Sequence, residues 1–248
     1  MKKRKAGIVI FVIVLIITAV RIKSMDSHRI SGRILAENIA GPGMLRLVEQ
    51  SMQARARKTS VTEIAVKERK HPQAALTFDD GPDIRYTPFL LDGLKERNIR
   101  VSFFLLGEKV EQYPELVERM QKEGHLVGNH TYHHVQLNKL NETKAREEIL
   151  KTNNLIYETT GVYPLYLRPP FGAWKKNLEL CVEMLPVFWT IDTLDWKVQN
   201  TEKIVRTVQE QIEDGAIILM HDEYDTSVEA ALQVVDELKN QGYELVTV

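Results

Sequence analysis

Short apolar runs alternate with amphipathic stretches along most of this chain, and this alternation restricts the fold more than any other feature. The candidate strands are 74–79, 100–105, 125–128, 165–168, 186–191, 216–220 and 244–248. The candidate helices are 86–97, 113–123, 142–160, 175–184, 201–213 and 227–241. Strand and helix alternate about six times, which predicts an α/β fold with a largely parallel sheet, either open or closed into a barrel.

Helix boundaries carry their own signals. Asn141 precedes the stretch 142–160 and is a favourable N-cap residue. A glycine follows four of the helical stretches, where a C-terminal cap is expected: Gly124, Gly161, Gly215 and Gly242. These signals support the predicted helices independently of their apolar periodicity.

The N-terminal 72 residues differ in character from the rest. A basic cluster, Lys2 to Lys5, precedes an unbroken apolar run from Ala6 to Val20. At about 1.5 Å per residue this run is shorter than a hydrocarbon core of about 30 Å, so it fits either a short membrane helix or a signal segment. We find no good cleavage site after Val20 and expect residues 1–23 to be an uncleaved anchor, with a cleaved signal as the alternative.

The domain organisation follows from this contrast. Residues 24–72 are polar and basic and are interpreted as a juxtamembrane stalk or extension, and residues 73–248 as the main domain. The segment at 1–23 implies export, so we expect the main domain to lie outside the cell membrane, or to be secreted if the segment is cleaved.

Charge is divided between these parts. Residues 1–72 contain 15 Lys and Arg against 5 Asp and Glu, and the remainder contains 18 against 29. An acidic main domain argues against nucleic acid as a partner. The single cysteine, Cys181, allows no intrachain disulfide and says little about compartment. We expect the domain to be a monomer.

Two adjacent carboxylates, Asp79 and Asp80, follow the apolar run Ala74 to Leu76 within Thr77 to Pro82. They stand where a predicted strand ends, which is where many α/β folds place their active sites. Neighbouring side chains in extended backbone point to opposite faces, so both can serve one site only if the backbone bends between them. A plain turn explains Asp-Gly-Pro equally well when the stretch is taken alone.

A histidine cluster follows the strand predicted at 125–128. His130 and His134 are four residues apart, which would place both on one face of a helical turn. Two imidazoles and one carboxylate are typical of an open catalytic site for a divalent metal. His133, at spacing three, is a rival for the second position, and a surface cluster without ligand function is the alternative.

Three more strand ends carry polar side chains. Arg168 is the first residue of a loop at 168–172 that two prolines stiffen. An arginine at this place can bind a carboxylate and keep it ionised. Asp195 and Trp196 place a carboxylate beside an aromatic wall suited to sugar rings. His221 ends the run 217–220 and is a candidate general acid if it lies beside Asp195. Each of these has a purely structural alternative.

Taken together, the five stretches resemble the ordered motifs of the polysaccharide deacetylases, the NodB-homology domain of carbohydrate esterase family 4. The stretches are Thr77 to Pro82, His130 to His134, Arg168 to Gly172, Asp192 to Trp196, and Leu219 to His221. The resemblance covers about residues 73–248 and not 1–72. It implies a distorted (β/α) barrel and metal-dependent removal of acetyl groups from N-acetylated sugars.

The resemblance also implies residue roles. Asp80, His130 and His134 would bind the metal, usually zinc in this family, with cobalt or manganese as alternatives. Asp79 would be the general base, and Arg168 would hold it. His221 would be the general acid, with Asp195 tuning its charge. Trp196 and Leu219 would line the acetyl pocket, and the backbone N–H of Phe171 would stabilise the oxyanion; many members have Tyr where this chain has Phe171.

We therefore expect an enzyme that deacetylates N-acetylglucosamine in a cell-envelope glycan, in particular peptidoglycan. A deacetylase for chitin-like oligosaccharides is the runner-up with the same chemistry. An inactive carbohydrate-binding homologue is a second class, but inactive members usually lose a ligand or the base, and none is missing here. A structural stalk protein would not explain five polar strand ends.

Overall fold

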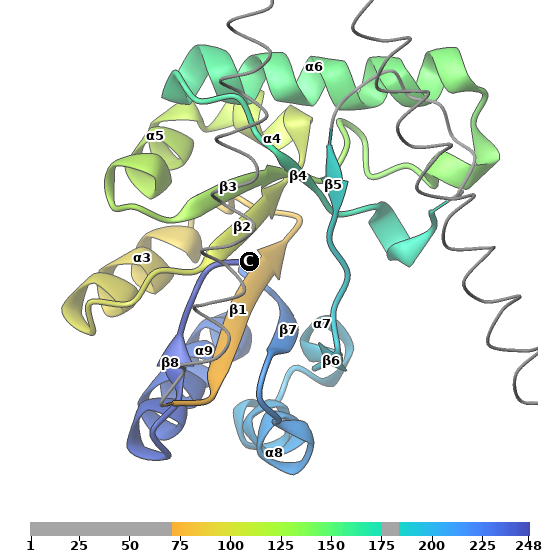
Figure 1. Cartoon of the computed structure of the whole chain (residues 1–248). Helices are drawn as coiled ribbons and strands as arrows, with labels where there is room; N and C mark the ends of the chain where they lie inside the picture. The colour runs from red at the N-terminus through yellow and green to blue at the C-terminus, as the bar shows by residue number, and fades with distance from the viewer. Residues whose placement is uncertain (1–70, 175–183) are drawn as a thin grey trace, which may run out of the picture. The chain divides into compact units, whose positions relative to one another are not determined.

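A central parallel sheet organises the part of the chain that the structure describes (Figure 1). The computed structural model describes residues 71–174 and 184–248, which belong to one unit, Lys70–Val248. The strands are β1 (Gln73–Asp79), β2 (Ser102–Leu105), β3 (Leu126–Asn129), β4 (Tyr166–Leu167), β5 (Leu185–Pro186), β6 (Ile191–Asp192), β7 (Ala216–His221) and β8 (Glu244–Leu245). Their order is β5-β4-β3-β2-β1-β7-β6, with β8 also paired to β1, and every pairing is parallel.

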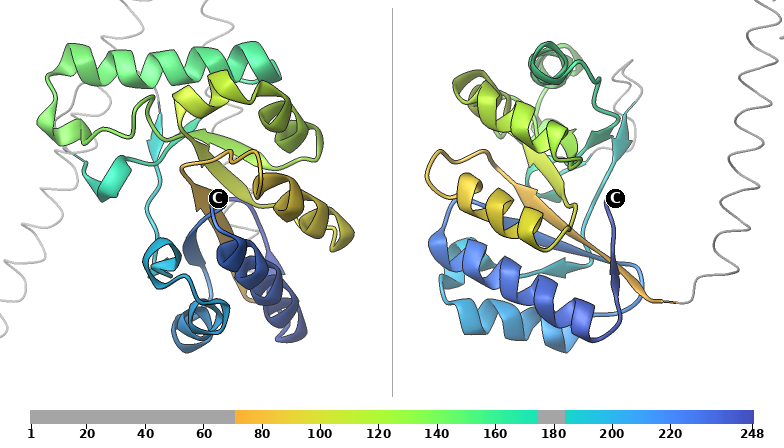
Figure 2. Two further views of the ribbon diagram at one scale, coloured as in Figure 1. Left: turned by 180° about the vertical axis from the view of Figure 1, so that it is seen from behind. Right: turned by 90° about the vertical axis from the view of Figure 1, so that its left-hand side faces the viewer.

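Helices connect the strands and lie outside the sheet, as the view from behind shows (Figure 2). They are α3 (Thr87–Glu96), α4 (Gly107–Gln112), α5 (Pro114–Lys122), α6 (Glu142–Thr160), α7 (Asp195–Val198), α8 (Thr201–Gln211) and α9 (Asp225–Asn240), with short 3-10 turns at Leu137–Lys139 and Pro170–Gly172. Parallel strands require such crossovers, which explains why the helices alternate with the strands in sequence.

The two faces of β1 have different surroundings. Leu76 and Phe78 are buried in the main apolar core, where the ring of Phe78 stacks on that of Phe103 with 5.4 Å between centroids. Thr77 and Asp79 alternate with them and therefore point to the opposite face. The helices cover the apolar side, so the polar side of β1 is left for a site.

The caps predicted at Asn141, Gly124, Gly161 and Gly242 are confirmed, whereas Gly215 lies beyond the end of α8, whose C-cap is Ile212. The side chain of Asn141 accepts a hydrogen bond from the backbone N–H of Lys144 at 2.9 Å, at the start of α6. Gly161 ends α6 with a φ of 71°, which a residue with a Cβ rarely adopts. The remaining predicted strands and helices agree with the structure to within three residues at each end, apart from the differences that follow.

The strand predicted at 186–191 is wrong. The run instead contains two short strands at opposite edges of the sheet, because Val187 donates to Leu167 of β4 while Thr190 donates to Ile217 of β7, each at 2.9 Å. Residues 187–190 cross between the two edges. Within the described residues β5 and β6 are not paired with each other, so the sheet is open on this side and the predicted barrel is incomplete.

One helix was not predicted, and several predictions concern residues that the structure does not describe. Helix α4 was not predicted, since Gly107 at its start is a poor helix former. The helix predicted at 175–184 lies, except for its last residue, outside the described residues. The same holds for the anchor at 1–23 and for nearly all of the stalk at 24–72. A search of the described residues finds no helix with the length and apolarity to cross a membrane.

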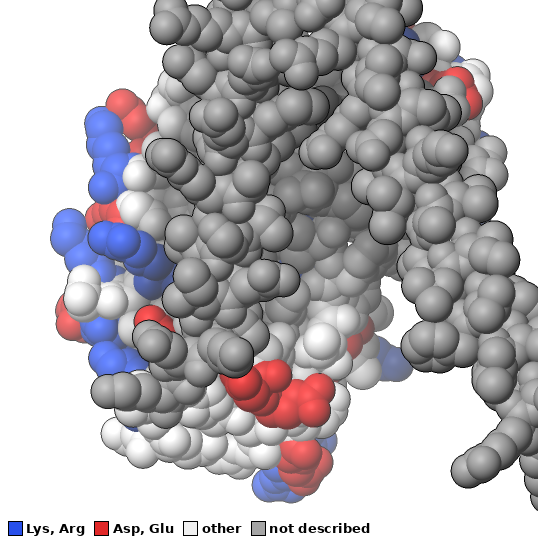
Figure 3. Space-filling view, viewed as in Figure 1, with Lys and Arg blue, Asp and Glu red and all other residues white. Residues whose placement is uncertain are grey.

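Lys, Arg, Asp and Glu side chains are interspersed along the edge formed by α3 and α5 (Figure 3). Arg119 pairs with Asp92 at 2.5 Å, and Lys95 pairs with Glu123 at 3.3 Å. Exposed pairs of this kind contribute only about 0–1 kcal/mol each.

Candidate active site

The register of the sheet places Asp79 opposite His221 at the carboxyl ends of β1 and β7. Thr77 lies opposite Leu219 in the same register, two residues earlier. Because residues two apart share a face of a strand, all four side chains belong to the polar face of the sheet. Two of the predicted catalytic residues are therefore neighbours by backbone hydrogen bonding.

The backbone bends between Asp79 and Asp80, which allows these two adjacent carboxylates to face the same site. Asp79 is the last residue of β1, and Asp80 has a φ of 68°, in the left-handed region. The bend turns the Asp80 carboxylate out of the strand alternation. The stretch is thus more than a plain turn, because both carboxylates face one group of histidines.

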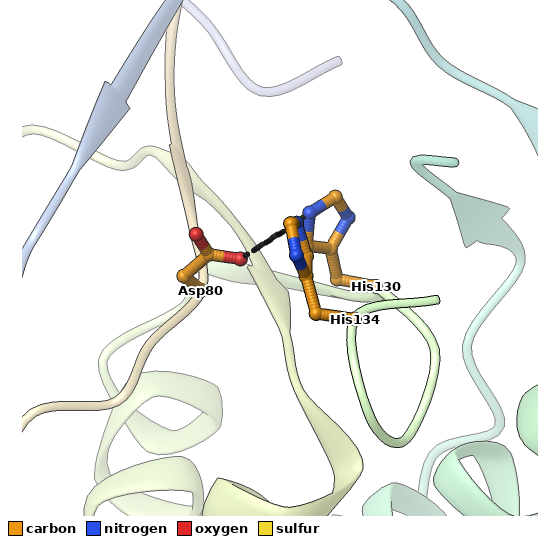
Figure 4. Close-up of side chains that lie close together, drawn as sticks. All are labelled: Asp80, His130 and His134. Carbon is orange, nitrogen blue, oxygen red and sulfur yellow. Dashed lines mark ion pairs between the residues drawn. The ribbon is translucent and has the colours of Figure 1, made fainter. Parts of the chain in front are cut away.

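Asp80, His130 and His134 form a group that fits a metal ion. One ligand atom from each lies within 4.8 Å of the others, and Oδ1 of Asp80 is 3.4 Å from Nε2 of both histidines. Figure 4 shows the carboxylate and the two rings facing one another. Oδ1 of Asp80 is buried without a hydrogen-bond partner among the described residues. A buried carboxylate oxygen left in this state fits a cation, and one carboxylate with two imidazoles is a typical ligand set.

The two histidines are not on a helical turn, so that part of the prediction is wrong. Residues 130–134 form a loop in which Thr131 and His134 have φ values of 68° and 54°. The loop brings the two rings to 5.0 Å between centroids without helical periodicity. His133 is not part of the group: its side chain is 58% exposed, and its Nδ1 contacts Glu148 at 2.8 Å.

His130 is held as a neutral imidazole. Its Nδ1 lies 2.6 Å from the backbone carbonyl of Arg168, an acceptor only, so Nδ1 carries the proton and Nε2 is left free to face Asp80. Burial lowers the pKa of His130 to about 3, although Asp80 opposes the shift. Metal binding needs neutral imidazole, and this environment supplies it.

The buried side chain of Arg168 holds Asp79. Its Nη1 donates to Oδ1 of Asp79 at 2.8 Å and to Oγ1 of Thr77 at 2.7 Å. Burial raises the pKa of Asp79, while the charges of Arg168 and His221 partly offset the rise. A carboxylate held in place with a raised pKa is suited to take up a proton.

His221 is paired with Asp195 from the start of α7. Its Nδ1 lies 2.8 Å from Oδ1 of Asp195, and its Nε2 lies 3.8 Å from Oδ2 of Asp80. Burial alone would lower the pKa of His221, but the hydrogen bond and charge of Asp195 outweigh it and raise that pKa to about 9. Conversely, burial would raise the pKa of Asp195, and the bond to His221 lowers it. The pair therefore carries a protonated imidazole beside the metal group.

The predicted substrate-binding residues lie beside residues of this centre in space or in sequence. The ring of Phe171 is 61% exposed and lies 4.5 Å from that of His134, and its φ of 59° is left-handed. Trp196 follows Asp195 in α7 and is 49% exposed. Leu219 is buried in β7, two residues before His221 and on the same face. Among these three, Phe171 is in ring contact with His134, a member of the metal group.

Sequence reasoning missed two supporting residues. Thr77 accepts from Arg168 and donates to the carbonyl of Ile218 at 2.7 Å; its spacing of two from Asp79 was the available signal. Asn129 donates to the Asn153 side chain at 2.7 Å and accepts from the N–H of Thr131 at 2.7 Å, so it ties the histidine loop to α6. Nothing in the sequence separates it from a surface asparagine except its place just before His130.

Comparison with known proteins gives consistent results. Residues 66–187 match the family described as polysaccharide deacetylase. Peptidoglycan-N-acetylglucosamine deacetylase PgdA of Listeria monocytogenes is 41% identical over 182 residues, which cover 73% of this chain and 39% of that protein. The chitooligosaccharide deacetylase of a Bradyrhizobium species is 32% identical over 188 residues, covering 68% of this chain and 86% of the relative.

A solved structure has the same fold. Peptidoglycan deacetylase PdaC from Bacillus subtilis matches with a TM-score of 0.70 and 41% identity, covering 72% of this chain and 89% of that chain. The chain spans well under half the length of the Listeria relative, so the similarity concerns one domain of that protein. On the combined likeness of sequence, fold and motif order, the chain belongs to the polysaccharide deacetylase family, carbohydrate esterase family 4.

Proposed function

We propose that this protein is a metal-dependent deacetylase that hydrolyses the N-acetyl group of N-acetylglucosamine residues in a cell-envelope glycan, most specifically peptidoglycan. The observation that carries the proposal is that Asp79 and His221 each approach a different member of the group Asp80, His130 and His134: Asp79 lies 3.7 Å from His130, and His221 lies 3.8 Å from Asp80. Amide hydrolysis needs an activated water, a proton acceptor and a separate proton donor, and these five side chains match that division.

Asp80, His130 and His134 would hold the metal. Their two imidazoles and one carboxylate favour zinc, with cobalt or manganese as alternatives. When bound, such a cation supplies Lewis-acid activation of water and of the amide carbonyl. The fixed tautomer of His130 and the Oδ1 of Asp80, which has no hydrogen-bond partner among the described residues, both support binding at this place.

Asp79 acts as the proton acceptor. Its Oδ2 lies 3.7 Å from Nε2 of His130, so it reaches the region that the ligand atoms enclose. Arg168 occupies Oδ1 and leaves Oδ2 for the incoming water. The raised pKa of Asp79 brings the carboxylate closer to the strength of a useful base at neutral pH.

His221 acts as the proton donor to the leaving amine. Asp195 occupies its Nδ1, so the transferable proton is on Nε2, the nitrogen nearest Asp80. Its pKa of about 9 keeps the ring protonated at neutral pH. Because a C–N bond breaks readily only when the nitrogen is protonated, this placement completes the reaction.

Glycan binding is supported by the exposed aromatic side chains at the centre. Phe171 and Trp196 offer apolar surfaces of the kind that pack against sugar rings. The Listeria and Bacillus relatives are named as peptidoglycan deacetylases, which favours that polymer. A chitin-like oligosaccharide is the second candidate, since the Bradyrhizobium relative bears that name.

We further propose the setting in which the domain works. The basic cluster and apolar run of residues 1–23 would anchor the chain in the cell membrane, and residues 24–72 would extend the domain toward the wall outside. If the anchor is cleaved, the domain is secreted. Fractionation of cells that produce the full chain, followed by N-terminal sequencing, distinguishes these two outcomes.

Acetate release tests the activity. The metal-loaded protein should release acetate from peptidoglycan, and a chelator should stop the release until zinc is restored. Asp79→Asn and His221→Ala should each lower the rate by on the order of 10² to 10⁴. N-acetylglucosamine oligomers form the second substrate arm. If the loaded protein releases acetate from neither glycan, the inactive binding homologue becomes the better explanation.

A further inference from the structure

The loop that carries both histidines is held to helix α6 by one carboxylate. Oε2 of Glu148 accepts hydrogen bonds from the backbone N–H of Tyr132 at 3.0 Å and of His133 at 2.9 Å. Its Oε1 lies 2.8 Å from Nδ1 of His133. The Glu148 side chain is 16% exposed, so most of it is packed against the protein, while the His133 ring that it contacts is 58% exposed.

The loop needs such support because it lacks regular structure of its own. Residues 130–134 are neither helix nor strand, and two of them adopt left-handed backbone. Helix α4 binds the loop from the other side, where the N–H of Gly107 donates to the carbonyl of Thr131 at 3.0 Å and that of Glu108 to the carbonyl of Tyr132 at 3.3 Å. Glu148 thus accepts from two backbone donors of the loop, while α4 donates to two of its carbonyls.

Tyr132 strengthens the attachment at the centre of the loop. Its hydroxyl donates to Glu111 of α4, and the ammonium of Lys151 in α6 lies 3.3 Å from its ring centroid. The side chain therefore links the loop to the same two helices as the backbone bonds do. The histidines at both ends of this segment depend on a short piece of backbone whose position α4 and α6 determine.

We propose that Glu148 is a positioning residue for the metal site, which sets the spacing of His130 and His134 through the backbone between them. The inference rests on the proposed function in so far as those histidines bind a metal. Partners outside the ligand set commonly change metal affinity by about 10–100-fold when mutated. Glu148 differs from such partners in acting on the loop rather than on a ligand ring.

Zinc affinity, measured on the metal-free protein by competition with a chromogenic chelator, tests the proposal without using activity. Glu148→Ala leaves two backbone donors without an acceptor and should weaken zinc binding by about 10–100-fold. Glu148→Gln keeps an oxygen that can accept from both backbone N–H groups. Its loss of zinc affinity, expressed as a logarithm, should be less than about a third of the loss in Glu148→Ala. Glu148→Asp keeps the charge but shortens the reach, so it should resemble Glu148→Ala.

The Gln and Asp variants distinguish two explanations: the hydrogen bonds by which Glu148 holds the loop, and the attraction of its negative charge for the cation. If the negative charge near the cation were what matters, Glu148→Asp would bind well and Glu148→Gln poorly, and that order would overturn the proposal. Glu147→Ala, which removes an exposed carboxylate one residue away on α6, is the matched control and should leave affinity unchanged. His133→Ala removes the ring contact but neither backbone bond and should have little effect.

Folding and function are controlled separately. Circular dichroism of each metal-free variant shows whether α6 remains folded, and if Glu148→Ala does not fold, the Gln and Asp pair still decides. Zinc affinity of all Glu148 variants equal to that of the unmodified protein refutes the inference and leaves the proposed function intact. Failure of the unmodified protein to bind zinc overturns both.

Discussion

Both carboxylate oxygens of Asp195 are bound by His221. Oδ2 accepts from the backbone N–H of His221 at 2.7 Å, and Oδ1 contacts Nδ1 of its ring at 2.8 Å. The first bond fixes where β7 ends relative to α7, and the second fixes the ring. Because both come from one buried carboxylate, the position of the ring and its charge are controlled by the same residue.

Asp195→Asn should therefore lower kcat by on the order of 10²-fold, since the amide cannot stabilise a protonated imidazole. Acetate release under saturating zinc measures the change. Zinc affinity should stay the same, because Asp195 is not in the ligand group. A kcat within a factor of about three of the unmodified protein would mean that Asp195 is only structural.

Arg168→Met should destabilise the fold by about 3–5 kcal/mol, because it leaves Asp79 as a buried carboxylate without its partner. Urea unfolding monitored by circular dichroism gives the free energy. Adding Asp79→Asn should recover part of the loss, since a neutral side chain needs no counter-charge. Strictly additive costs in the double variant would contradict this account of the pair.

Zinc should raise the melting temperature of the metal-free protein, since a ligand at about 100 times its Kd stabilises the folded state by about 2.7 kcal/mol. His134→Ala should abolish most of the shift, and the variant should still fold because the His134 side chain is 30% exposed. Differential scanning calorimetry measures both proteins. His133→Ala is the control and should keep the zinc-induced shift. If that variant loses the shift, His133 is the ligand and the assignment to His134 is wrong.

His125 should make stability depend on pH. Its ring is buried, its Nδ1 accepts from the N–H of Val101 at 3.2 Å, and burial lowers its pKa from 6.5 to about 4. Below pH 6.5 His125 takes up a proton in the unfolded chain, whereas in the folded chain it stays neutral down to about pH 4. The free energy of unfolding therefore falls as the pH drops toward 4. The slope from this group is at most about 1.4 kcal/mol per pH unit.

His125→Asn removes the titrating ring and keeps a hydrogen-bond acceptor. Urea midpoints measured at several pH values in that window should therefore change less in the variant than in the unmodified protein. Parallel pH curves for the two proteins would show that the acid sensitivity of the fold comes from other groups.

The sequence was sufficient to predict what repeats and what is strongly patterned. The apolar run of β1, the cap at Asn141 and the polar strand ends all follow from local rules, and the structure brings together Asp79, Asp80, His130, His134, Arg168, Asp195 and His221 as predicted. Parallel strands collect their carboxyl ends at one edge, so residues far apart in sequence meet without any further information.

What the sequence did not reveal depends on tertiary contacts. The run 186–191 is apolar enough for one strand, but its two ends pair with different neighbours, and no local pattern encodes that choice. The left-handed conformations of Thr131 and His134 are unusual for residues with side chains and are imposed by α4 and α6. Glu148 is one glutamate among several on α6, and only the folded loop distinguishes it.

The register of β1 against β7 has a consequence for how such a catalyst can change. Since Asp79 and His221 are paired residues of one hydrogen-bonded ladder, the gap between the proposed base and the proposed acid is as rigid as the sheet itself. A slip of one residue would turn one of them to the helix-covered side and end catalysis outright. Changes in the flanking loops could therefore alter which glycan is bound, while the sheet keeps the spacing of the two groups proposed to transfer protons.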